Sequence, residues 1–137
     1  PESRVAMVGL FKPLIPRLKD LGARVEVVDI ERKIGDPVDF KAKLNNWAEA
    51  VIVSSTAILN DTIDDILENI NPEAKTAMLG PSTPLSGRPF ENTSVKILGG
   101  TVPIEKEPVL KAIRNGKGTP AIQKFSRKAF LVISDTP

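Results

Sequence analysis

Small residues and hydroxyls that could hold a polar ligand are concentrated in the stretch Gly-Pro-Ser-Thr-Pro at residues 80–84, directly after a short apolar run. Small residues let a ligand approach backbone N–H groups, and hydroxyls add further donors. Pro81 and Pro84 fix their φ angles, so Ser82 and Thr83 between them should be held as preorganised donors. Turns use the same residue types, however. The stretch therefore predicts either the edge of a ligand site or a plain turn.

A second polar stretch, SSTAILNDT, follows another apolar run at residues 54–62. We expect Thr56 at the start of a helix, where its hydroxyl either caps the helix or contacts a ligand. Asn60, one turn later, and Thr62 could point toward the same cleft or simply face solvent. Asn gains little from helix propensity, which favours a functional role for Asn60.

Carboxylates supply the remaining chemistry, because the sequence contains no cysteine and no histidine. The commonest general base and the usual ligands of soft metals are therefore missing. Acid–base catalysis would depend on Asp29, Glu31, Asp61 or Lys12. A metal would be either a hard divalent ion held by Asp29, Glu31 and Asp61, or an ion that arrives inside an organic complex.

The nucleotide-binding fingerprints are incomplete or missing. The first glycine turn reads GLFKPL, so bulky Phe11 replaces the glycine that lets a pyrophosphate approach the backbone. Asp29 or Glu31 does follow Gly9 at the distance of about 20 residues expected for a ribose-binding acid. The sequence has no P-loop motif.

Composition indicates an ordinary soluble protein: 137 residues, 41% of them apolar and 26% charged, with a net charge of +2. We expect one domain over residues 1–137, either free-standing or the C-terminal domain of a longer protein. The basic excess is scattered along the sequence, so we expect no nucleic acid partner. No apolar run is long enough for a membrane span, so we expect no membrane partner and a cytoplasmic location.

Short runs rich in valine and isoleucine alternate with segments of helical periodicity. Strands are predicted at residues 5–10, 25–30, 51–54, 76–79, 95–98 and 129–133, and helices at 14–21, 39–47, 57–70, 105–115 and 120–125. This alternation predicts an α/β fold: a doubly wound, Rossmann-like three-layer sandwich with a mostly parallel sheet of five or six strands.

In such a sheet, ligands bind outside the carboxyl ends of the strands. The residues that follow the predicted strands are therefore the predicted ligand-binding set: Gly9, Phe11, Thr56, Asn60, Thr62, Gly80, Pro81, Ser82, Thr83, Gly99, Gly100 and Thr101. The first three residues after the fifth strand, Gly99 to Thr101, are expected to form a turn.

Four stretches together, VAMVGLFKPL, EAVIVSSTAILNDTIDDIL, AMLGPSTPLSGRPF and ILGGTV, make essentially the whole chain resemble the putative heavy-metal chelation domain family. The resemblance implies a Rossmann-like domain of unknown function, usually preceded by a smaller domain similar to the enolase N-terminal fold. It also implies a link to metal uptake or to corrinoid-type cofactor biosynthesis. The chain departs from the family pattern at Asp61, where the family often has a small residue, and the missing Cys and His argue against tight binding of a soft metal.

Three functions remain open at this point. The chain could bind a small-molecule ligand, a divalent metal or a metal complex; it could be an enzyme for an organic or nucleotide-like substrate with carboxylate acid–base groups; or it could be an interaction module. In the last case its cleft would be filled by a second subunit in a homodimer or by a missing N-terminal domain, with Phe11, Pro13 and Phe90 lining the contact.

Overall fold

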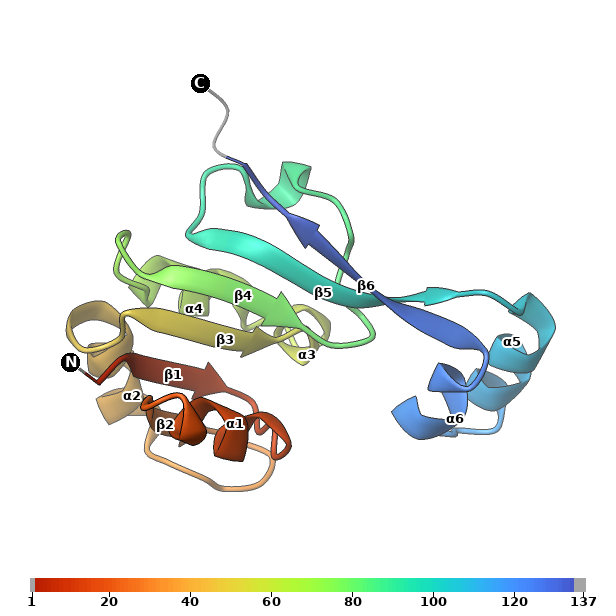
Figure 1. Cartoon of the computed structure of the whole chain (residues 1–137), viewed down its shortest axis with the longest axis horizontal. Coiled ribbons are helices and arrows are strands. Elements are labelled where there is room, and N and C mark those ends of the chain that lie inside the picture. The colour runs from red at the N-terminus through yellow and green to blue at the C-terminus, as the bar shows by residue number, and fades with distance from the viewer. Residues whose placement is uncertain (1, 135–137) are drawn as a thin grey trace.

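The computed structural model describes residues 2–134 and contains one six-stranded sheet with the order β2-β1-β3-β4-β5-β6 (Figure 1). The strands are β1 (Arg4–Val8), β2 (Arg24–Val28), β3 (Ala50–Ser54), β4 (Lys75–Leu79), β5 (Val95–Pro103) and β6 (Ser126–Val132). The first five are parallel and β6 runs antiparallel to β5. The predicted doubly wound, mostly parallel α/β fold is confirmed.

The helices follow the predicted alternation, with local sequence fixing several of their ends. They are α1 (Leu14–Asp20), α2 (Pro37–Asn46), α3 (Thr56–Leu59), α4 (Ile63–Asn69), α5 (Lys106–Arg114) and α6 (Thr119–Gln123), with a 3₁₀ turn η1 (Arg88–Phe90). Asp36 starts α2 by accepting hydrogen bonds from the N–H groups of Val38 and Asp39. Gly22 ends α1 in the left-handed conformation, with φ +82°. Within residues 2–134, no helix is long and apolar enough to cross a bilayer.

The direction of the chain decides which face of the sheet each helix covers. The chain steps from β1 outward to β2, and then back past β1 to β3 and β4. Right-handed crossovers therefore place α1 on one face, here called the front, and α2, α3 and α4 on the back. Figure 1 shows α3 and α4 behind β3 and β4.

The back face holds the hydrophobic core. One cluster joins α2, α3 and the β1–β3 strands through Ala6, Val28, Phe40, Leu44, Ala48, Val51, Val53, Ala57, Ile70 and Ala74. A second cluster continues it under β4 and β5 through Met78, Phe90, Val95 and Leu98. Phe90 is 5% exposed, so the expectation that it lines an interaction surface is wrong: it fills the core beneath η1.

The front face is left partly open over β5 and β6. Cross-strand pairing places Ile97 opposite Val132, and Gly99 opposite Phe130. Phe130 and Val132 are 68% and 72% exposed. A side chain at Gly99 would collide with Leu79 and Phe130, because its Cβ would lie 2.7 and 2.8 Å from them. The lack of a side chain at Gly99 therefore leaves room for Leu79 and Phe130 to pack over β5.

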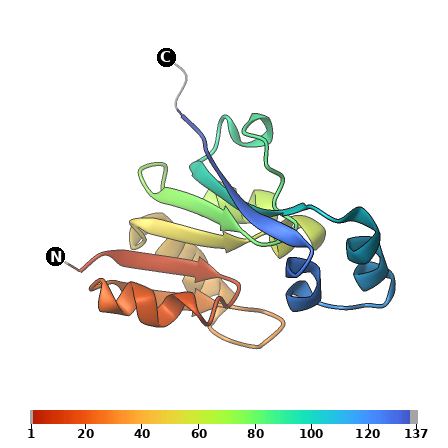
Figure 2. The same ribbon diagram turned by 45° about the vertical axis from the view of Figure 1, so that its right-hand side comes forward.

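An arm projects from the sheet beyond the end of β4. The last pair between β4 and β5 is Leu79 with Gly99, whereas β5 continues to Pro103 with β6 as its partner. The arm, residues 101–128, is thus a two-stranded ribbon that carries α5 and α6 at its outer end (Figure 2). Only Val109 and Ala112 are buried among its apolar residues.

Two predicted elements differ from the structure. The helix predicted over residues 57–70 is split, because Asp61 adopts a left-handed φ of +59° between α3 and α4. Leu59, the last residue of α3, is consequently 70% exposed. The turn predicted at Gly99–Thr101 is also wrong: these residues lie within β5, since pairing with β6 extends that strand.

Candidate functional site

The order of the strands reverses between β1 and β3, which is where doubly wound sheets bind their ligands. Gly9, directly after β1, contacts the ends of both neighbouring strands. Its N–H donates to the carbonyl of Val28 in β2 at 2.8 Å, and a Cβ on Gly9 would lie 2.7 Å from the Cβ of Ser54 in β3. Gly9 also has φ +90°, which disfavours any other residue.

The end of β4 lies against the same edge. Ser55 N–H donates to the Leu79 carbonyl at 2.8 Å, and Gly80 N–H donates to the Gly99 carbonyl at 3.0 Å. A Cβ on Gly80 would collide with the Ser55 hydroxyl, and one on Gly100 would lie 3.0 Å from the Thr83 carbonyl. The predicted glycines are therefore brought together at one edge, where close packing of the protein with itself already accounts for them.

The Gly80–Pro84 segment is a tight turn that sends its two hydroxyls in different directions. Thr83 N–H donates to the Gly80 carbonyl at 3.1 Å. Pro81 and Ser82 are exposed, whereas Thr83 is 6% exposed and its Oγ1 has no hydrogen-bond partner among the described atoms. Ser82 alone of the two hydroxyls is presented to solvent.

The hydroxyl that organises the start of α3 is Ser54, not Thr56. Ser54 Oγ lies 2.9 Å from Thr56 Oγ1 and accepts a long hydrogen bond from the Thr56 N–H at 3.4 Å. Thr56 is the first residue of α3 and its side chain is exposed, so the prediction that it caps the helix is wrong. Ser54 was missed by sequence reasoning, although its position as the last residue of the β3 apolar run was a usable signal.

Asn60 turns back onto its own helix. In the orientation that satisfies both ends of its amide, Nδ2 donates to the carbonyls of Thr56 and Ala57 at 3.2 and 3.1 Å and to Thr62 Oγ1 at 2.7 Å. These bonds add to the ones that the same two carbonyls already accept from the backbone N–H groups of Asn60 and Thr62 at the C-terminus of α3. The contacts of Asn60 and Thr62 are therefore those of a helix end, and they explain why an Asn stands before the left-handed Asp61.

Asp29 is buried and holds the loop that follows β1. Its carboxylate accepts hydrogen bonds from Leu10 N–H at 2.9 Å, from Arg32 N–H at 3.0 Å, and from the Arg32 guanidinium at 2.8 Å. Burial opposes ionisation, but these hydrogen bonds and the Arg32 charge outweigh it and lower the pKa of the Asp29 carboxyl. This carboxylate is already engaged with the protein.

The three carboxylates proposed as metal ligands do not form a cluster. Glu31 and Asp61 are exposed, and across residues 2–134 no group of three or more Asp, Glu, His or Cys residues could hold a metal ion. With no cysteine or histidine anywhere in the sequence, the side chains present do not fit a heavy-metal site.

The remaining predicted residues border the edge or lie away from it. Phe11 is half-buried, and its N–H lies 3.4 Å from the Met7 sulfur. Lys12 is exposed. Thr101 pairs with Lys128 at the base of the arm, so it belongs to the arm and not to the edge formed by β1, β3 and β4. Two surface hollows, one on α5 and one beside α4, are lined by none of the predicted ligand-binding residues.

Comparison with known proteins matches this fold to a family. The sequence pattern of the DUF364 family, described as putative heavy-metal chelation, matches residues 1–132. The chain belongs to the DUF364 family. The comparison with curated proteins gave no match.

Two solved DUF364 structures share the fold. A protein of unknown function from Pyrococcus horikoshii is 22% identical, with a TM-score of 0.83 over 96% of this chain and 56% of its own. A protein of unknown function from Desulfitobacterium hafniense is 18% identical, with a TM-score of 0.79 over 96% of this chain and 53% of its own. The present chain thus spans little more than half the length of either relative.

Proposed function

We propose that this DUF364 chain binds a small polar ligand, or a metal already held in an organic complex, at the edge formed by the carboxyl ends of β1, β3 and β4. The observation that carries the proposal is the direct contact of Gly9 with Ser54 at the point where the strand order reverses. Exposed hydroxyls of Thr56 and Ser82 flank this contact on the β3 and β4 sides.

The chemistry of the edge favours a ligand that offers oxygen acceptors. The exposed side-chain groups of Thr56 and Ser82 are neutral hydroxyls, which donate to carboxylate, phosphate or amide oxygens. Asp29 is already bound by Leu10 and Arg32, so its charge does not repel such a ligand strongly. A metal reaches this edge as a complex, because residues 2–134 hold no cluster of side chains that would coordinate a free ion.

Catalysis has weaker support than binding. A general base works best with a pKa near the working pH, and the lowered pKa of Asp29 makes that carboxylate a poorer proton acceptor. Binding without turnover therefore fits the described residues better than acid–base chemistry does.

The experiment is a thermal-shift panel of free divalent metals, nucleotides and corrinoid precursors with the metal inserted or absent. A ligand at about 100 times its dissociation constant should add about 2.7 kcal/mol to the free energy of unfolding. Thr56→Val with Ser82→Ala should remove the shift and leave the ligand-free melting temperature unchanged. Ser3→Ala, an exposed hydroxyl at the opposite edge of the sheet, is the control. A shift that persists in the double variant, or no shift with any organic ligand or metal complex, would contradict the proposal.

A further inference from the structure

The small net charge of the chain conceals a strong separation of charge. The arm, residues 101–128, carries seven basic and two acidic side chains and is thus +5. The other residues carry twelve basic and fifteen acidic side chains and are together −3. The arm is one continuous stretch of the sequence, so the expectation that the basic excess is scattered along the chain is wrong, and the fold sets this basic stretch apart as a projecting arm.

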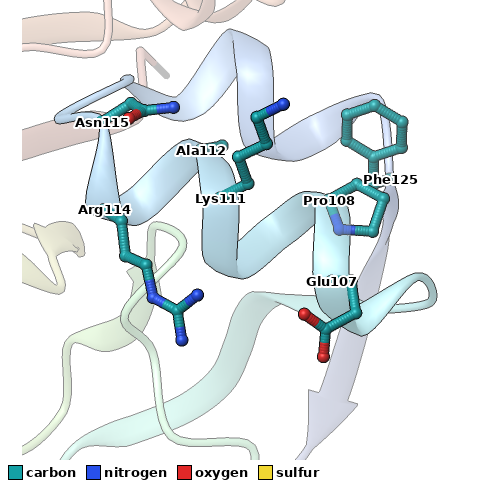
Figure 3. A pocket seen from close by; sticks show the side chains of 7 residues that line it. All are labelled: Glu107, Pro108, Lys111, Ala112, Arg114, Asn115 and Phe125. Atoms are coloured by element: carbon teal, nitrogen blue, oxygen red, sulfur yellow. The ribbon is translucent and has the colours of Figure 1, made fainter.

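The charges on the arm have no counterpart within the described residues. Five ion pairs form there, and none includes a residue of the arm. On α5, Lys111 and Arg114 border an open hollow of about 640 Å³ with an apolar lining from Pro108, Ala112 and Phe125 (Figure 3). Glu107 and Asn115 complete the lining.

The hollow on α5 has the composition of an interface, with an apolar centre and a charged rim. Pro108, Ala112 and Phe125 supply the apolar lining, and Lys111 and Arg114 border it together with a single acid, Glu107.

The opposite charge occurs on α4. A smaller hollow of about 200 Å³ is lined there by Asp64, Leu67, Glu68, Asn92 and Thr93. The neighbouring Asp65 pairs with Lys41 at 2.8 Å, but Asp64 and Glu68 form no ion pair within residues 2–134. The unpaired charges on this surface are thus acidic, whereas Lys111 and Arg114 at the hollow on α5 are basic.

The two surfaces belong to separate parts of the molecule. Figure 1 shows α5 at the outer end of the arm and α4 behind β3 and β4. In the contacts between elements, α5 packs on α6 and α4 packs on α2. Their charges can be paired by a second copy of the chain.

We propose that the arm of one copy docks on α4 of a second copy, with Lys111 and Arg114 against Asp64 and Glu68. Because unlike surfaces meet, two copies form a closed dimer when their arms exchange reciprocally, and a head-to-tail series when they do not. The contact lies away from the ligand edge of β1, β3 and β4, so its test is independent of ligand binding.

The test is to measure the mass of the species in solution by sedimentation velocity at rising protein concentration, in low and in high salt. The native chain should associate, and salt should weaken the association, because exposed charge pairs are screened. Lys111→Glu with Arg114→Glu should weaken it about tenfold or more, as should Asp64→Lys with Glu68→Lys, since each places like charges in contact. All four side chains are exposed, and circular dichroism checks that each variant is folded.

A mixture of the two charge-reversed double variants tests directly whether the arm contacts α4 of a second copy. The mixture restores opposite charges at every contact, so mixed assemblies should form although neither variant associates alone. Arg17→Glu with Lys19→Glu on α1 makes the same change in net charge on exposed residues outside both surfaces, and should leave association unchanged. A native chain that is monomeric at every concentration, a control that weakens association equally, or a mixture that stays monomeric would each overturn the proposal.

Discussion

The body of the molecule, residues 2–100, and its arm differ in what holds them in place. The body buries two continuous apolar clusters between the sheet and the helices on its back face. The arm has only two buried apolar residues, Val109 and Ala112, and is anchored through the long pairing of β5 with β6. The body is also acidic and the arm basic. We infer that stability resides in the body, whereas the arm is built mainly to make contacts.

The largest difference should appear when an apolar side chain is shortened in each region. Leu98, 0% exposed in the body, should lose about 2–5 kcal/mol of folding free energy on replacement by alanine, because a cavity remains in the core. Ile113, 55% exposed on the arm, should lose less than about 1 kcal/mol. Urea denaturation of both variants measures the two losses of folding free energy. Equal losses would show that the arm is as tightly packed as the body.

A second comparison lies within the body, between two glycines with positive φ. Gly9→Ala should cost about 2–3 kcal/mol, because it adds a collision with Ser54 to the backbone strain of about 1–2 kcal/mol. Gly22→Ala should cost the backbone strain alone, since nothing lies within 4 Å of its Cβ position. Thermal unfolding gives both values. Identical costs would mean that the β1 and β3 ends are not in close contact.

A smaller effect is expected where Asp29 fixes the loop after β1. Asp29→Asn should cost about 1–3 kcal/mol at neutral pH, because a buried charged hydrogen bond is lost. The pKa of Asp29 is lowered in the folded state, so its contribution is complete above the unfolded pKa of about 3.9 and disappears as the pH falls through the lower folded value. Stability measured against pH should therefore show the native chain and the variant converging in acid. Glu31→Gln, at an exposed neighbouring position, is the matched control variant.

The sequence was sufficient for the architecture because buried parallel strands leave a strong signal. The Val- and Ile-rich runs located all six strands, and left-handed glycines, Gly22 and Gly116, follow the ends of α1 and α5, as is typical of helix C-termini. The break between α3 and α4 was not predictable in the same way. It depends on a left-handed Asp61 and on the Asn60 amide bonding back to α3, and both are invisible to apolar periodicity.

The sequence predicted where the candidate site lies better than it predicted which residues contact one another there. Gly9 and Gly80 do lie at the ends of β1 and β4, and Gly100 lies within β5, but contacts with Ser54, Ser55 and Thr83 explain all three glycines as well as a ligand would. Such contacts depend on which strands are neighbours, and the sequence alone does not contain that order. The arm was missed for the same reason. The double glycine at 99–100 is typical of a turn, whereas antiparallel pairing with β6 carries β5 straight through it.

The most direct test of the proposed ligand edge is an amide NMR titration of the chain with free Zn²⁺ and, separately, with the ligands or metal complexes that raise the melting temperature. The proposed function predicts that an organic ligand or complex shifts the amides of Gly9, Ser54, Thr56 and Ser82, while free Zn²⁺ leaves them in place. Shifts confined to the arm or α4, or a tight site for free Zn²⁺ on this chain, would contradict it.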